Sequence, residues 1–115
     1  MLIQVRTDNH IRNNEALREE VRAELEGALT RRFAERLQRL EVYFQDTNSH
    51  KKGTDIRCAI EAHPAGYQPV AVDATAPSVE AAMDAAVEML ERALAHRLGR
   101  LADRNGRVSM SGQET

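Results

Sequence analysis

Four basic side chains near the end of the chain recur at the spacing of one helical turn. They are Arg92, His96, Arg100 and Arg104. Residues four apart lie on one side of a helix, so this spacing predicts a basic row along a helical surface. Such a row can neutralise successive phosphates of a nucleic-acid backbone. The same residues also suit a plain solvated helix end, because arginines in a last turn interact favourably with the helix dipole.

Acidic side chains form a second row on the other flank of the same predicted helix. They are Glu80, Asp84, Glu88 and Glu91. Residues 92–107 carry five arginines against one aspartate, a local charge of +4, whereas the whole chain has a net charge of -2. Since a partner contacts one face of a protein, the negative total does not exclude binding to nucleic acid.

Smaller groups of basic residues occur earlier in the chain. Arg18 and Arg22 lie four residues apart, beside the apolar stripe of another predicted helix. If the two helices pack side by side and parallel, these arginines can share a face with the Arg92 row. Lys51 and Lys52 lie in the polar segment "TNSHKKGTD", which predicts a secondary basic loop.

The histidines and the single cysteine do not form a catalytic or metal-binding motif. The histidines are His10, His50, His63 and His96, and they fall in different predicted elements without the spacing of metal ligands. Cys58 lies on the apolar face of a predicted strand, which favours packing over nucleophilic chemistry. Asp8 and His10 lie beside asparagine residues, as is typical of a turn. We therefore expect no enzyme, no metal, no cofactor and no small-molecule substrate.

The composition indicates one globular domain with few aromatic side chains. The chain has 115 residues, of which 42% are hydrophobic and 30% are charged. It has no Trp, two Tyr and two Phe, so a sheet that stacks several bases is excluded, and any RNA binding must depend on phosphates and shape. No apolar run reaches the ~18 residues of a membrane span, and the first residues lack a secretory pattern. We expect a cytoplasmic protein without membrane contacts.

Apolar periodicity predicts the elements that must position the basic residues. Strands with one apolar face are predicted at 2–6, 40–45, 56–63 and 70–74, and amphipathic helices at 15–33 and 79–102. Asn13 or Asn14 is suited to cap the first helix and Ser78 the second. The predicted fold is α+β in the order β-α-β-β-β-α, with a four-stranded mixed sheet and two roughly parallel helices on one face. The domain is expected to span 1–102, followed by a flexible tail over 103–115.

This order, together with the segments "IQVRTDNHI", "NEALRE" and "AAMDAAVEMLERALAHRLGRL", is similar to that of a known family. The chain resembles the family of ribosome hibernation-promoting factor and ribosome-associated inhibitor A, also called the sigma-54 modulation protein family. The similarity covers roughly residues 1–102. The chain resembles a short form, without the additional C-terminal domain with which long members pair ribosomes.

The resemblance implies a fold like that of double-stranded RNA-binding domains, and a stress or stationary-phase protein. Such proteins occupy the decoding region of the small ribosomal subunit, where they contact rRNA and ribosomal proteins and hold the ribosome inactive. The resemblance implies rRNA contacts for five arginines: Arg18, Arg22, Arg92, Arg97 and Arg100. Helical geometry alone adds His96 and Arg104. Unlike the lysine-rich helices of many members, the first predicted helix here also carries several glutamates.

Two functions remain open at this point. The first is a ribosome-binding factor that inhibits translation through a basic helix face. The alternative is a protein-interaction module that modulates a transcription or stress regulator, as the older family name suggests.

Overall fold

Six helices and strands follow one another in the predicted order. The computed structural model describes residues 1–29, 33, 35–47 and 55–110. The elements are β1 (Leu2–Thr7), α1 (Glu15–Ala28), β2 (Leu37–Asp46), β3 (Ile56–Pro64), β4 (Val70–Ala76) and α3 (Val79–Met110). This arrangement confirms the predicted fold class.

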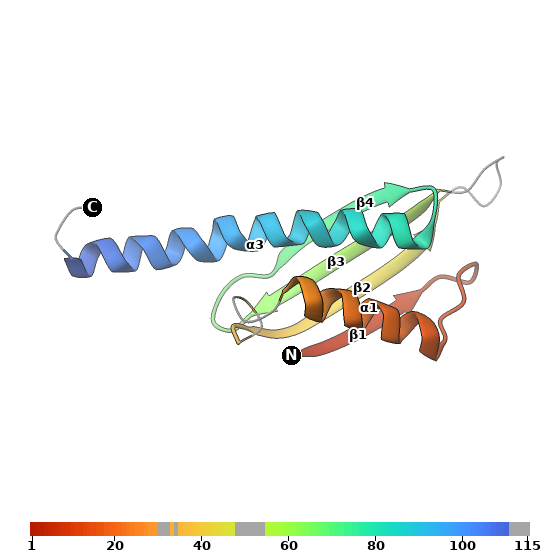
Figure 1. The fold of residues 1–115 in the computed structure, drawn as a ribbon, viewed down its shortest axis with the longest axis horizontal. Helices are drawn as coiled ribbons and strands as arrows, with labels where there is room; N and C mark the ends of the chain where they lie inside the picture. Colours follow the sequence, from red (N-terminus) through yellow and green to blue (C-terminus); the bar gives the residue numbers. More distant parts are fainter. Residues whose placement is uncertain (30–32, 34, 48–54, 111–115) are drawn as a thin grey trace.

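The four strands form one mixed sheet in the order β1-β2-β3-β4. β1 runs parallel to β2, and its Leu2 lies opposite Arg39. β2, β3 and β4 form an antiparallel meander. Figure 1 shows both helices on the same face of the sheet and running in the same direction, as predicted.

The core lies between that face and the two helices. Alternate side chains of the strands point into it, so that β3 alternates between buried and half-buried positions along its whole length. Residues that repeat at intervals of three and four cover it from the helices. These are Leu17, Val21 and Leu25 in α1, and Ala82, Met83, Ala86, Val87, Leu90 and Leu94 in α3. Within the described residues, no charged side chain is buried, and neither helix has an apolar stretch that could span a membrane.

Side-chain caps fix where each helix begins. The Asn14 side chain accepts a hydrogen bond from the Leu17 amide at 2.9 Å, and Ser78 Oγ accepts one from the Ala81 amide at 3.1 Å. Both satisfy an amide that the first helical turn leaves without a partner. The neighbouring Asn13, the other predicted candidate, instead donates to the Val5 carbonyl at 3.1 Å and ties the loop to β1.

α1 ends at Ala28, five residues before the predicted end at Phe33. At Leu29 the backbone turns out of the helix, with φ -107° and ψ 32°, while its amide still bonds the Leu25 carbonyl. On a continuous helix, position 33 would lie about 115° from the centre of the buried stripe. Because the chain turns at Leu29, both Leu29 and Phe33 are buried in the core.

β2 begins at Leu37, three residues before the regular alternation that starts at Leu40. Leu37 and Leu40 are both buried, although residues three apart in a regular strand point to opposite faces. The pairing with β3 shifts between Leu37 and Arg39, which makes Gln38 an extra residue of the kind found in a β-bulge. The irregularity brings both leucines to the core. Because it interrupts the two-residue alternation, that alternation does not identify the start of the strand.

α3 continues to Met110, eight residues beyond the predicted end near 102. Residues 103–110 of the predicted flexible tail are therefore helical, and residues 111–115 lie outside the described part of the chain. The residues after 102 have no apolar period and include Gly106, which is why the sequence predicts an earlier end of the helix. A glycine costs a helix only about 1 kcal/mol relative to alanine, and an aspartate four residues before an arginine offsets part of that cost.

Candidate nucleic-acid interface

Arg18 and Arg22 lie on the outer flank of α1. Both are exposed, and Arg18 Nη1 donates to the side-chain oxygen of Asn13 at 3.1 Å and to its carbonyl at 3.4 Å. Asn13 thereby connects Arg18 to the end of β1, since it also bonds the Val5 carbonyl. We call Arg18 and Arg22 the α1 patch.

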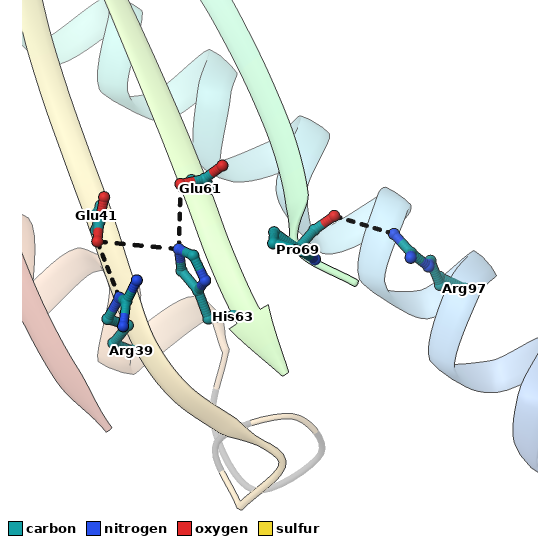
Figure 2. A network of polar contacts seen from close by, with 6 residues as sticks. All are labelled: Arg39, Glu41, Glu61, His63, Pro69 and Arg97. Carbon is teal, nitrogen blue, oxygen red and sulfur yellow. Dashed lines mark hydrogen bonds and ion pairs between the residues drawn. The ribbon is translucent and has the colours of Figure 1, made fainter. Parts of the chain in front are cut away.

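Three basic side chains lie near the middle of α3. Arg92 and His96 are exposed, and Arg97 is half-buried. Arg97 Nη1 donates to the Pro69 carbonyl, just before β4, at 3.2 Å, as Figure 2 shows. This bond fastens α3 to the end of the sheet. We call Arg92, His96 and Arg97 the α3 patch.

The remaining predicted residues lie where side chains are not described. Arg100 and Arg104 follow Arg97 in α3, but their side chains lie outside the described residues. Figure 1 shows that α3 continues past the end of the sheet. Lys51 and Lys52 also lie outside them. Their roles in binding stay predictions.

Carboxylates line the contact between the first halves of the two helices. They are Glu20 and Glu24 of α1 with Glu80 and Asp84 of α3, and we call them the acidic seam. A hydrogen bond with Glu80 and partial burial raise the pKa of Glu20. Burial, followed by a hydrogen bond with Asp84 and the surrounding negative charges, raises the pKa of Glu24 to about 7.

The acidic seam separates the two basic patches. On α1, positions 18 and 22 lie about 120° to 160° around the helix axis from Glu20 and Glu24. The α1 patch therefore faces away from α3, even though the helices are parallel as predicted. The described basic side chains therefore form two patches, one on either side of the acidic seam. The sequence pattern suggests a shared face, because neither helix alone shows that its carboxylates lie against those of the other helix.

Two other candidates have structural roles. Asp8 Oδ1 accepts from the His10 amide at 3.0 Å, and Asp8 Oδ2 accepts from the Asp46 amide at 2.8 Å, which confirms the turn prediction. Cys58 is fully buried, and burial raises its pKa to about 12. A thiol so seldom ionised is a poor nucleophile.

A cluster that the sequence did not reveal lies on the open face of the sheet. Glu41 of β2 contacts Glu61 and His63 of β3 through donor atoms that all lie within 4.8 Å of one another. His63 Nε2 is 3.1 Å from Glu61 Oε1 and 3.9 Å from Glu41 Oε2, and Arg39 Nε donates to Glu41 Oε2 at 2.9 Å (Figure 2). Only the strand register could have predicted it, because Glu41 pairs with Glu61 and Arg39 with His63.

One protein family matches most of the chain, and two solved structures share its fold. The family described as "Sigma 54 modulation protein / S30EA ribosomal protein" matches residues 3–102. A ribosomal subunit interface protein from Coxiella burnetii has a similar structure, with a TM-score of 0.70 and 17% identity over 86% of this chain and 99% of that chain. The N-terminal domain of Thermus thermophilus Protein Y has a TM-score of 0.64 and 23% identity over 80% and 93% of the two chains. No curated protein sequence matches this chain.

Proposed function

Because the chain belongs to the sigma 54 modulation protein / S30EA ribosomal protein family, we propose that it is a cytoplasmic ribosome-binding factor that holds ribosomes inactive. The family match carries this proposal, and it covers the whole sheet, α1 and most of α3. The protein acts by binding and has no catalytic role.

The finer proposal is that the domain occupies the decoding region of the small subunit. The exposed arginines of the α1 and α3 patches, with Arg100 and Arg104, neutralise rRNA phosphates. The described surface offers few exposed aromatic rings, with Tyr67 the only exposed one, so shape and charge supply the recognition. The bulk of the domain then excludes mRNA and tRNA.

Cosedimentation with purified small subunits at low and moderate salt tests this proposal. We expect the protein to pellet with the subunit at low salt and less so at moderate salt, because each phosphate contact releases counterions. Arg92→Glu combined with Arg100→Glu should abolish the association. Absence of binding by the unaltered protein at both salt concentrations would contradict the proposal.

A control variant with the same change in net charge distinguishes binding through a specific surface from a general electrostatic effect. Arg6 and Arg12 are exposed and lie outside both helices. Arg6→Glu combined with Arg12→Glu changes the net charge as much as the α3 variant does. We expect this control to bind nearly as well as the unaltered protein. Equal losses in the two variants would mean that no defined helix surface is used.

The acidic seam favours a second function, in which the protein binds another protein. Four carboxylates on the helical layer repel phosphates and attract a basic peptide segment. A ribosomal protein or a separate regulator could supply such a segment. This function predicts that a pull-down after nuclease treatment recovers a protein partner and enriches no rRNA. It also predicts that Glu20→Gln combined with Asp84→Asn loses the partner. Both results together would support this function over rRNA binding.

A further inference from the structure

The cluster on the open face of the sheet brings three donor atoms towards a single point. Glu41 and Glu61 occupy paired positions on β2 and β3, and His63 follows Glu61 on the same side of β3. His63, Glu41 and Glu61 keep 18%, 29% and 46% of their side-chain surface exposed. The cluster is thus partly covered at His63 and Glu41 and open to small ions at Glu61.

His63 Nε2 is directed at the two carboxylates of the cluster. The nitrogen lies 3.1 Å from one carboxylate oxygen and 3.9 Å from another. A bare imidazole lone pair directed at two carboxylates would be repelled by both. The nitrogen therefore either donates a hydrogen bond to Glu61 or binds a metal ion that the carboxylates also contact.

The spacing of the donor atoms fits a transition metal. Ligands held about 2.1 Å from a tetrahedral Zn²⁺ ion lie about 3.4 Å from one another. The distances from His63 Nε2 to the two carboxylate oxygens, 3.1 and 3.9 Å, fall on either side of that value. One imidazole nitrogen with two carboxylates suits zinc or its neighbours in the first transition row, whereas Mg²⁺ prefers oxygen ligands alone.

The surrounding backbone holds the donor set in place. β2 and β3 pair along nine positions of β2, and the irregularity at Gln38 lies immediately before Arg39. Arg39 Nε donates a hydrogen bond to Glu41 Oε2 at 2.9 Å, which restricts the orientation of that carboxylate. Hydrogen bonds to ligands of this kind commonly orient them for the metal.

We propose that Glu41, Glu61 and His63 form a binding site for one Zn²⁺-like divalent ion that clamps β2 to β3. The protein supplies three ligands, which leaves at least one coordination position for water. The site goes beyond ribosome binding and does not depend on it. A hollow of about 710 Å³ that includes Arg39, His63, Tyr67 and Arg97 lies beside it and gives the open position access to solvent.

Metal analysis of the untagged full chain tests the site. After equilibrium dialysis against Zn²⁺ with a large excess of Mg²⁺, we expect about one zinc ion per chain by mass spectrometry. Co²⁺ should give the visible absorption of a four- or five-coordinate nitrogen and oxygen site. His63→Gln should abolish both signals, and Glu61→Gln should weaken Zn²⁺ binding at least about tenfold.

Two controls keep the test decisive. His96→Gln removes an exposed histidine outside the cluster and should leave the stoichiometry unchanged. Circular dichroism without metal should show that His63→Gln and Glu61→Gln are folded. No zinc on the unaltered chain, or equal zinc on the unaltered chain and His63→Gln, would overturn the proposal and leave a hydrogen bond between His63 and Glu61.

Discussion

At the level of single residues, Glu24 lies where both burial and a second carboxylate favour its neutral form. Its pKa is about 7 in the folded protein, against 4.5 for the free group. A raised carboxyl pKa stabilises the fold fully below about pH 4.5, and that stabilisation is lost as the pH rises through about 7.

Glu24→Gln should therefore stabilise the protein at alkaline pH. The amide stays neutral, so the variant avoids the repulsion by Asp84 that ionised Glu24 meets. Solvent screens part of that repulsion, and we expect a gain of about 1 kcal/mol in the free energy of unfolding near pH 8, with little gain near pH 4. Urea denaturation at both pH values measures it.

Glu19→Gln is the matched control on the same helix. Glu19 is exposed. 

Glu19 does not belong to the acidic seam, so its substitution should change stability by less than about 0.5 kcal/mol at either pH. A gain for Glu19→Gln equal to that for Glu24→Gln would show that the seam has no special role.

The residues with the most distinctive chemistry were the hardest to predict from the sequence. Cys58 and the turn at Asp8 could be assigned correctly, because each depends on nearby residues and on the two-residue period of a strand. Glu41, Glu61 and His63 could not, since the side chains that meet are twenty residues apart. The acidic seam was missed for the same reason, because nothing in either helix alone shows which flank the other will cover.

At the level of elements, two glycines should respond in opposite ways to substitution by alanine. Gly27 lies near the end of α1, and a Cβ atom added there would meet nothing within 4 Å. Gly66 lies in the β3–β4 turn with φ 79°, where the Tyr67 amide donates to the Pro64 carbonyl at 3.3 Å. Side chains other than glycine rarely adopt that φ.

We expect Gly27→Ala to raise the free energy of unfolding by about 0.5 to 1 kcal/mol, because alanine has the higher helix propensity. Gly66→Ala should lower it by about 1 to 2 kcal/mol. Urea denaturation of the two variants measures both effects. A loss of stability in Gly27→Ala, or none in Gly66→Ala, would contradict the backbone conformations described for α1 and the turn.

The sequence predicted which elements form more accurately than where they end. The alternation at Val42 and Phe44 identified β2, since one buried face imposes a period of two residues. The irregularity after Leu37 and the turn at Leu29 break those periods to bury additional side chains. Such breaks depend on the assembled core and leave no regular signal in the sequence.

At the level of the whole molecule, α3 is much longer than the sheet that it covers. Its last buried residue within the described part is Leu94, and the helix continues to Met110. Arg97 is bonded at the end of the sheet, and the 13 residues that follow add about 20 Å of helix. The end of α3 is therefore placed to contact a partner.

Removal of residues 103–115 should separate folding from binding. We expect circular dichroism to lose the signal of about eight helical residues, while the free energy of unfolding changes by less than about 1 kcal/mol. Binding to small subunits should weaken, because Arg104 and Arg107 are removed. The slope of the logarithm of the binding constant against the logarithm of salt concentration should become shallower by the amount expected for about two phosphate contacts.

A full-length variant with Arg104→Gln and Arg107→Gln distinguishes charge from helix length. We expect it to bind as weakly as the truncated protein and to keep the helical signal. Full binding by the truncated protein would show that the end of α3 takes no part in the contact with the ribosome.

The parallel pairing of β1 with β2 also determines the order in which the protein can fold as it is synthesised. β1 leaves the ribosome first, but its Leu2 pairs with Arg39 and its Thr7 with Phe44, so it has no neighbouring strand until those residues have emerged. The meander of β2, β3 and β4 connects strands that are close in the chain, and such local contacts form quickly. α3 emerges last and closes the core. A nascent chain therefore completes its arginine-bearing helix only after all four strands have emerged, which delays any contact made through that helix until the sheet beneath it can form.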